Sequence, residues 1–484
     1  MNQFPTQLLA LAPLAVLCVT VVVVMLSIAA RRHHFTTATM TVIGLNLALV
    51  SLLGVLRITP IQVTSLFIID DYSVLYAAIV LVAALACTTL AHAYLETLPD
   101  RREEFYLLLL CSTGGALALI ASRHFASFFI GLELLSVPLY GMVAYAFRDR
   151  ISLEAGLKYM VLSGAASAFL LFGMALLYAA SGTLEYAGLV DGLANGGEHQ
   201  SWVMIGVGMM VIALTFKLSL VPFHLWTPDV YEGAPGPSSA FLATVSKVAV
   251  FAVLLRFFTL APPAANEWLL TLVGVIAFAS MMVGNLLALR QRNVKRLLGY
   301  SSIAHLGYLL SVIVAGGELG TEAVGVYLAT YIATMLGAFG VITLVSSPYS
   351  GTDAGALHHY RGLFWRRPYL ATVFTLMMLS LAGIPITAGF IGKFYVIAVA
   401  VDAHLWWLAG GIVVGSAIGL YYYLRLMVIM FLDEPGESRR DAVSGWGQQS
   451  GGIMVLLLAA LVIFFGVYPQ PLIALVHAAG MAHG

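Results

Sequence analysis

Four ionisable side chains, Glu133, Lys217, Lys247 and Lys393, interrupt long apolar stretches of this sequence. A charge at the centre of a bilayer costs at least about 2.5–3.5 kcal/mol on insertion scales, so such residues normally pair or line a water-filled path. Burial disfavours the charged form of a lysine, whereas a nearby carboxylate favours it. Moving the carboxylate, or its charge, would load or unload the amine. This pattern predicts a pathway for protons.

A static ion pair between Glu133 and Lys217 is the alternative interpretation, in which the two side chains only hold helices together. That interpretation leaves a surplus of positive charge, because there are three central lysines and one central carboxylate. Uncompensated buried charges are expensive, and a group in this position changes its charge or keeps water around it. The surplus therefore favours titratable or hydrated lysines.

Three further residues are secondary candidates. Lys158 follows Glu154 by four residues, which is the favourable order for an ion pair on a helix surface. Lys158 therefore either pairs with Glu154 at the membrane rim or lies near the proton path at Glu133. His305 shares a helix face with Ser301 and Ser302 and could relay protons near neutral pH, or simply bond between helices. For His224, beside Pro222, a structural role and a proton-transfer role stay open.

Prolines interrupt two of the apolar stretches, each beside a buried lysine. Pro222 and Pro228 follow Lys217, and Pro385 precedes Lys393. A proline frees a backbone carbonyl four residues earlier, which a membrane tolerates only where protein or cavity water satisfies it. The sequence therefore predicts two broken helices, although a simple proline kink would leave the same pattern.

The composition identifies the kind of chain that carries these residues. Of its 484 residues, 61% are hydrophobic and 10% are charged, and 23 basic side chains balance 23 acidic ones. A soluble protein carries about a quarter charged residues. These values exclude a soluble multidomain protein, a disordered chain and a nucleic-acid-binding protein. What remains is an all-α polytopic membrane protein.

Fourteen stretches are long and apolar enough to span a bilayer. They are residues 8–30, 37–56, 73–95, 105–122, 125–146, 155–180, 202–230, 238–260, 269–289, 297–316, 323–346, 369–400, 405–432 and 452–470. The breaks fall in spans 7 and 12, five apart, so spans 4–8 and 9–13 are predicted to be two five-helix repeats, the second inverted. The predicted segments are a three-helix segment (1–100), the two repeats (101–262 and 263–434), and a final loop with helix 14 (435–484).

The distribution of basic residues predicts which side each connection lies on. The connections that follow odd-numbered spans carry fifteen Lys and Arg residues, whereas those that follow even-numbered spans carry only Arg57 and Arg123. By the positive-inside rule the odd-numbered connections are cytoplasmic and both termini are periplasmic. The fifteen are Arg31, Arg32, Arg101, Arg102, Arg148, Arg150, Arg290, Arg292, Lys295, Arg296, Arg361, Arg366, Arg367, Arg439 and Arg440. Arg256 and Arg425, near helix ends, are expected to extend towards the bilayer surface.

Neither a nucleotide-binding glycine loop nor a metal-ligand cluster occurs in the sequence, and Cys18, Cys87 and Cys111 lie far apart. We therefore expect no cofactor in this chain.

Two motifs carry a resemblance to a known family. The segment Gly131–Tyr140 (GLELLSVPLY) resembles helix 5 of the antiporter-like subunits of respiratory complex I. The segment Phe216–Tyr231, which contains PFHLWTPDVY, resembles the broken helix 7 of the same subunits. The resemblance extends along essentially the whole chain. Within that family the chain is most similar to the N-type subunits. The lysine at 393 fits N or L rather than M, no lateral helix of the L type follows span 14, and Arg361–Pro368 (RGLFWRRP) also resembles N.

The resemblance implies a fourteen-helix fold with inverted repeats that moves protons, driven by quinone reduction elsewhere in a bacterial inner-membrane complex. It assigns Glu133 and Lys217 to an electrostatic switch, Lys247 to the centre and Lys393 to the exit. NADH, FMN, iron–sulfur clusters and quinone are then expected in other subunits, and the partners are an M-type subunit, small K-, J-, A- and H-type subunits and lipid. A cation/proton antiporter subunit without redox coupling is the alternative, and a structural scaffold is a third possibility that the surplus of lysines speaks against.

Overall fold

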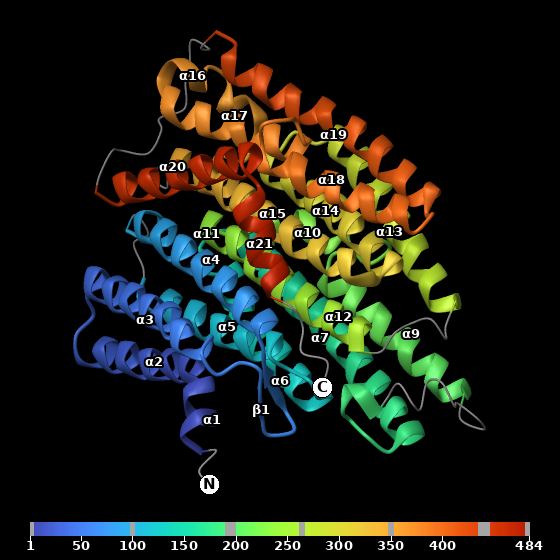
Figure 1. The fold of residues 1–484 in the computed structure, drawn as a ribbon. Coiled ribbons are helices and arrows are strands. Elements are labelled where there is room, and N and C mark those ends of the chain that lie inside the picture. Colours follow the sequence, from blue (N-terminus) through green and yellow to red (C-terminus); the bar gives the residue numbers. More distant parts are fainter. Residues whose placement is uncertain are drawn as a thin grey trace.

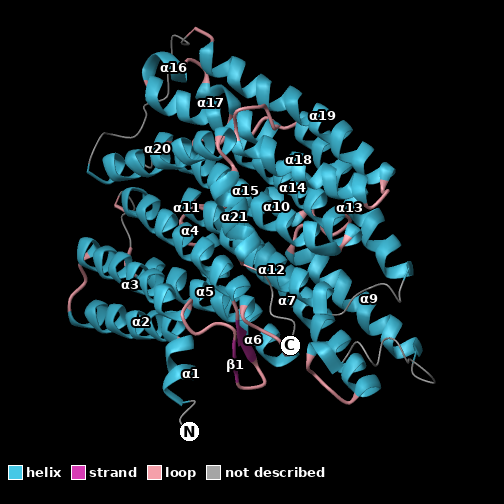
Figure 2. Ribbon diagram, in the orientation of Figure 1, coloured by secondary structure: helices cyan, strands magenta, loops and turns pink. Residues whose placement is uncertain are grey.

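The computed structural model describes residues 4–96, 102–188, 200–260, 267–346, 353–433 and 446–479. These residues are mostly helical, with one antiparallel hairpin that the sequence did not predict (Figure 1, Figure 2). In this part of the chain twelve helices are long and apolar enough to cross a membrane, and two shorter apolar helices occupy spans 4 and 12. All fourteen predicted spans are therefore helices, because lipid leaves a backbone no other way to satisfy its polar groups within one segment.

Each predicted segment is mainly helical in its described residues. The N-terminal segment contains α1 (Phe4–Ala10), α2 (Ala12–Ala30), α3 (His34–Val55), β1 (Ile61–Val63), β2 (Phe67–Ile69) and α4 (Asp71–Leu95). The predicted first repeat contains α5 (Glu104–Ile120), α6 (Phe125–Val143), α7 (Arg150–Ser181), α9 (Gln200–Lys217), α10 (Trp226–Gly233), α11 (Gly236–Phe241), the π-helical turn η2 (Leu242–Ser246) and α12 (Lys247–Leu260). The predicted second repeat contains α13 (Glu267–Leu289), α14 (Val294–Ala315), α15 (Gly317–Val345), the 3-10 turn η5 (Leu357–Tyr360), α16 (Leu363–Arg366), α17 (Pro368–Ala382), α18 (Ala388–Asp402) and α19 (Trp406–Phe431). The last helices are α20 (Trp446–Val467) and α21 (Gln470–Ala478).

Spans 7 and 12 are broken, as predicted. Span 7 consists of α9 and α10, and span 12 consists of α17 and α18. Span 1 is also in two pieces, which the sequence analysis missed: Pro13, at the start of α2, removes a backbone donor and ends α1. The symmetry relation between the two repeats, and their boundaries, stay predictions.

The described parts of connections 1, 3, 9 and 11 lie together on one face (Figure 1). Arg32 of the first connection pairs with Glu104, at the end of the third, at 2.7 Å. Tyr94, at the end of span 3, donates a hydrogen bond to Asp353 of the eleventh connection at 2.9 Å. Lys295, at the end of the ninth connection, pairs with the same Asp353 at 2.8 Å. Arg101, Arg439 and Arg440 lie outside the described residues.

The described parts of connections 2, 4 and 6, with α1 and α21, lie on the other face. Backbone bridges join Phe67 to Ser122 and His124 to Glu185, which links connections 2, 4 and 6. The N-terminal α1 packs against β1, and C-terminal α21 returns to the start of α15. These connections therefore alternate between the two faces. Which face is periplasmic stays a prediction.

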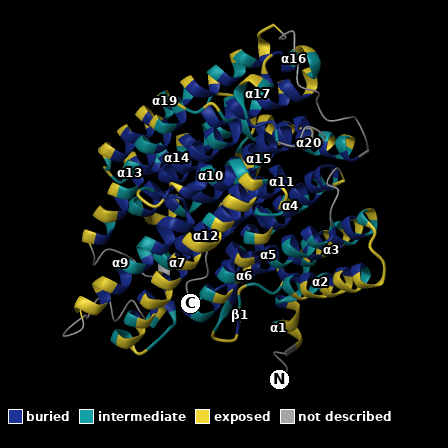
Figure 3. Cartoon of the chain, turned by 180° about the vertical axis from the view of Figure 1, so that it is seen from behind, coloured by how far each residue is buried: buried dark blue, intermediate teal, exposed yellow. Residues whose placement is uncertain are grey.

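Burial is concentrated in the middle of the bundle (Figure 3). In the apolar windows of α14 and α15, 94% and 89% of the residues are buried, compared with 28% in those of α2 and α20. The outer helices present apolar side chains such as Val19, Val161 and Leu457 outward. Apolar residues on the outside are those that a lipid environment accepts, and the enclosed helices are free to carry polar groups.

Arg256 does not extend to the bilayer surface, so that expectation is wrong. Its guanidinium is fully buried and makes two 2.8 Å hydrogen bonds to the carboxylate of Asp70. Asp70 also caps α4 by accepting from the backbone of Ser73. The sequence could not show this, because the two partners are 186 residues apart. Arg425 instead donates to the carbonyls of Leu289 and Gln291, at the end of α13.

Candidate functional site

The break in span 7 places Lys217 in the interior. Lys217 is the last residue of α9, and Pro222 lies in the non-helical segment before α10. Pro228 is the third residue of α10. The backbone N–H groups of a helix's first turn have no partner within the helix, so a proline there costs no hydrogen bond. Pro228 therefore lies at the start of the second half of span 7 and does not cause the break. The carbonyl of Phe216, in the last turn of α9, accepts from the backbone N–H of Ser219 at 2.9 Å and from Trp226 Nε1 at 3.2 Å. Protein groups therefore bind this carbonyl at the end of α9.

Glu133 and Lys217 lie close together, and three serines each bond to one or the other of them. The Lys217 ammonium is 4.0 Å from Glu133 Oε1 and is 4% exposed, whereas Glu133 is 26% exposed. Lys217 donates hydrogen bonds to Ser136 (2.9 Å) and Ser163 (2.7 Å), and Ser167 donates to Glu133 at 2.5 Å. The serines lie on α6 and α7, and sequence reasoning missed them because serine is common in apolar helices. This geometry permits a change of charge at Glu133 to act directly on Lys217.

Lys247 lies where the π-helical turn η2 passes into α12, and it is fully buried. Its ammonium donates to the backbone carbonyl of Lys217 at 2.8 Å and to Ser219 at 2.5 Å. It also lies 5.0 Å from the centre of the Trp226 ring. Single π-helical turns inside helices occur frequently at functional sites.

Lys393 has a corresponding environment in the second break. Gly383, with φ of 80°, ends α17, and Pro385 lies between α17 and α18. The Lys393 ammonium donates to the carbonyls of Leu381 (2.8 Å) and Ala382 (3.0 Å), which are the last residues of α17.

The surplus of positive charge therefore has a structural explanation. No carboxylate among the described residues lies within ion-pair distance of Lys247 or Lys393. Each ammonium instead meets the carbonyl end of a broken half-helix, α9 or α17. That end carries a partial negative charge of roughly half an electron.

His305 lies between the two breaks in a group of tyrosines. Its ring nitrogens share hydrogen bonds with Tyr327 (2.7 Å) and Tyr423 (3.3 Å). The predicted neighbours Ser301 and Ser302 bond to tyrosines, not directly to the imidazole: Ser301 to Tyr423 and Ser302 to Tyr331.

A polar cavity lies beside this group, and its lining includes His305, Thr330, Thr334 and Ser380. No hydrogen bond between described residues joins Lys247 to it.

No hydrogen bond or ion pair between described residues joins Lys158 or His224 to Lys217, Lys247 or Lys393. Lys158 is 41% exposed and pairs with Glu154 (2.7 Å) and Asp229 (2.8 Å), so the rim ion pair is what the structure shows. His224 is buried in the break of span 7, where neither ring nitrogen has a hydrogen-bond partner in the part of the chain described.

Gly389→Ala is expected to disturb the second break. A Cβ at position 389 would overlap the backbone carbonyl of Ser380, so α18 would have to move away from α17. Overpacking of this kind costs about 1–3 kcal/mol. The measurement is the thermal denaturation midpoint of the solubilised complex. Gly410→Ala, in α19 with nothing within 4 Å, is the matched control and should not lower it. Equal midpoints for both variants would contradict the close contact.

Known proteins are similar to this chain along nearly its full length. The family model for NADH:quinone oxidoreductase/Mrp antiporter transmembrane regions matches residues 122–419, more than half of the chain. NADH-quinone oxidoreductase subunit N of Ectopseudomonas mendocina (strain ymp) is 62% identical over 485 aligned residues, which cover 99% of this chain and 98% of that protein.

Solved structures share the fold. A chain of respiratory complex I from Thermus thermophilus, solved with bound aureothin, is 34% identical with a TM-score of 0.81, covering 97% of this chain and all of that one. A chain of the Mrp complex from Dietzia sp. DQ12-45-1b has a TM-score of 0.85 at 22% identity, covering 99% and 97%, and this likeness shows the fold alone. The high identity to complex I relatives favours the redox-coupled interpretation over a separate antiporter. The chain belongs to the subunit N family of NADH–quinone oxidoreductases, the antiporter-like membrane subunits of respiratory complex I.

Proposed function

We propose that this chain carries protons through a polar axis formed by Glu133, Lys217, Lys247, His305 and Lys393, driven by quinone reduction in another part of the complex. One observation carries the proposal: the Lys247 ammonium is bound to the backbone of Lys217, whose side chain faces Glu133. The pair and the centre of the axis therefore meet at one residue. A change of charge at Glu133 or Lys217 therefore acts at the Lys217 carbonyl, which accepts the hydrogen bond from the Lys247 ammonium.

The direction of transport follows from the basic residues. The face with odd-numbered connections is the cytoplasmic one, and protons leave towards the periplasm by way of Lys393. Water and the tyrosine hydroxyls around His305 are the means of transfer between Lys247 and Lys393. NADH, FMN, iron–sulfur clusters and quinone belong to other subunits, and the partners are the neighbouring membrane-arm subunits of M, K, J, A and H types in a bacterial inner membrane.

Lys217→Ala tests the switch. Allosteric coupling between sites is typically 1–3 kcal/mol, or about 5- to 150-fold. We therefore expect the share of NADH-driven proton pumping that this chain carries, measured in membrane vesicles, to decrease about 5- to 150-fold. The NADH:ferricyanide activity and the amount of assembled complex should stay unchanged. Thr215→Val, a buried shape-conserving change on the same helix, is the matched control. Normal pumping by a correctly inserted Lys217→Ala variant would contradict the switch.

A further inference from the structure

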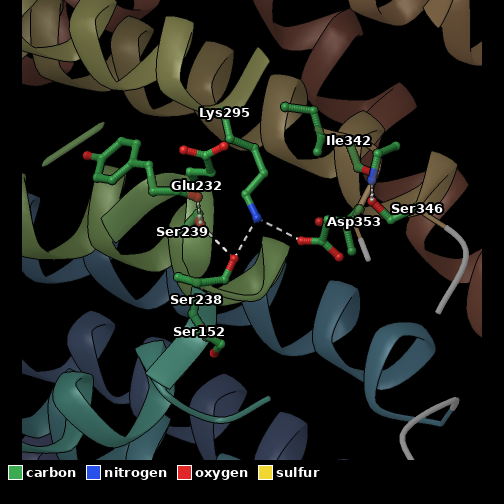
Figure 4. A network of polar contacts seen from close by, with 12 residues as sticks. Ser152, Glu232, Ser238, Ser239, Lys295, Ile342, Ser346 and Asp353 are labelled. Atoms are coloured by element: carbon green, nitrogen blue, oxygen red, sulfur yellow. Dashed lines mark hydrogen bonds and ion pairs between the residues drawn. The ribbon is translucent and has the colours of Figure 1, made fainter. Parts of the chain in front are cut away.

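Lys295 is a buried lysine outside the polar axis. The positive-inside count assigned it to a cytoplasmic connection, yet its side chain is 1% exposed. It is the second residue of α14, and its ammonium donates to the carbonyl of Ala234 (2.6 Å) and to Asp353 Oδ2 (2.8 Å), as Figure 4 shows. The mechanism proposed above makes no use of this group.

Asp353 is the negative charge that faces the Lys295 ammonium. The first turn of a helix is the positive end of its dipole and opposes a cation there. Arg296, the next residue, adds a second cation, which Asp229 (2.6 Å) and Glu232 (2.8 Å) hold. Both of these carboxylates are one-third exposed, and Asp229 also binds Lys158. Asp353 is therefore the carboxylate that offsets the Lys295 charge.

Asp353 also connects the buried lysine to the surface. Its side chain is 14% exposed, so it reaches the water that Lys295 does not. Its other oxygen accepts a hydrogen bond from the Tyr94 hydroxyl at 2.9 Å, and Tyr94 lies at the end of α4. A partly exposed carboxylate in front of a buried amine repeats the arrangement of Glu133 and Lys217.

The inner side of Lys295 leads towards the polar axis. The Ala234 carbonyl that binds the ammonium also accepts from Ser239 of α11 at 3.4 Å. That helix continues through η2 to Lys247, eight residues further on, a rise of about 12 Å. Tyr231, which is fully buried, packs against Gly299 of α14 in the same region.

We propose that Lys295 and Asp353 form a loading site through which protons enter from the face with the odd-numbered connections. The proposal rests on the proposed function, because it supplies the axis at Lys247. Asp353 takes a proton from water and becomes neutral, and Lys295 passes its own proton inward to the Lys247 amine. The Asp353 carboxyl then returns its proton to Lys295, which restores the ion pair. Each cycle moves one proton inward and leaves both groups as they began.

Asp353→Asn in the complete complex is the first test. Inside-out vesicles expose the predicted cytoplasmic face, so NADH-driven pumping is measured against external pH from 6 to 8. Without the carboxylate, uptake depends on direct capture from solution, and the ratio of variant to wild-type rate should fall about tenfold per pH unit. Asp353→Glu should restore the wild-type profile. Arg361→Gln, an exposed residue of the same connection, is the control and should leave the profile unchanged.

A purely structural ion pair is the competing explanation, and a double variant separates the two. Lys295→Gln with Asp353→Asn removes both charges and leaves no unpaired one, a change that is often neutral for stability. The loading site predicts that the double variant assembles but keeps the steep loss of pumping with pH. Recovery of the wild-type rate and profile would overturn the proposal, even if Asp353→Asn alone does not assemble.

Lys247→Met, measured in the same vesicles, distinguishes failure of the loading site from failure of the axis. Wild-type pumping by the Lys247→Met variant would contradict the proposed function itself. Loss of pumping in Lys247→Met, together with a wild-type pH profile in the double variant, would overturn the loading site alone.

Discussion

Lys247→Met is expected to stop proton transfer through this chain. Methionine has a similar length and lies easily in an apolar site, but it holds no proton. A positioned acid–base group typically contributes 10²- to 10⁴-fold to a proton-transfer rate, so transfer through this position should slow by roughly that factor. The number of protons pumped per NADH should then fall by the whole share that this chain carries. The measurement is that ratio in sealed vesicles, with NADH:ferricyanide activity as the control for assembly.

Lys247→Arg separates the role of the proton from the role of the charge. Arginine preserves the positive charge at the end of α9 but does not lose its proton in a protein. If Lys247 only neutralises the carbonyl end of that half-helix, the arginine variant should pump normally. If Lys247 carries a proton, the arginine variant should fail as the methionine variant does. Normal pumping by the arginine variant would contradict the carrier role.

Asp70→Asn is expected to lower the stability of the folded chain by about 3–5 kcal/mol, the usual effect of removing one partner from a buried ion pair. Asparagine has the same shape and is as good a helix N-cap, so the cap on α4 is preserved. What changes is the charge that faces Arg256, whose side chain is 1% exposed. Less chain should accumulate in membranes, and the thermal midpoint of the solubilised complex should decrease.

A double variant checks that the loss comes from the unpaired guanidinium. Arg256→Met combined with Asp70→Asn removes both charges, and it should recover most of the stability, because neutral replacement of a buried pair is often tolerated. Asp71→Asn, at the adjacent and less buried position, is the control for the substitution type. A double variant as unstable as Asp70→Asn would show that the ion pair is not the cause.

The spans and breaks could be predicted from the sequence because they are local properties. A stretch of about 20 apolar residues becomes a helix in lipid whatever its neighbours are. Pro222 and Pro385 remove backbone donors at known positions, and both breaks occur beside the expected lysines. The central position of Glu133 and Lys217 in their spans indicated a pair, and the structure places them 4.0 Å apart.

The partners of the other charges could not be predicted, because hydropathy does not show which helices meet. Arg256 was expected at the bilayer surface and instead pairs with Asp70. Lys295 was counted among the basic residues of a cytoplasmic connection, and the structure buries it against Asp353. The tyrosines around His305 come from α15 and α19, and no local spacing connects them.

Hydropathy, charge counts and proline positions establish how many times the chain crosses the membrane, where two helices break and which residues are costly enough to need a function. Only the folded bundle shows how the surplus of lysines is tolerated: Lys247 and Lys393 bind the carbonyl ends of α9 and α17. The physical reason is that a broken helix exposes its dipole and its unpaired carbonyls at the break. The ammonium that they bind comes from a different helix of the bundle for α9 and from the other half of the same span for α17.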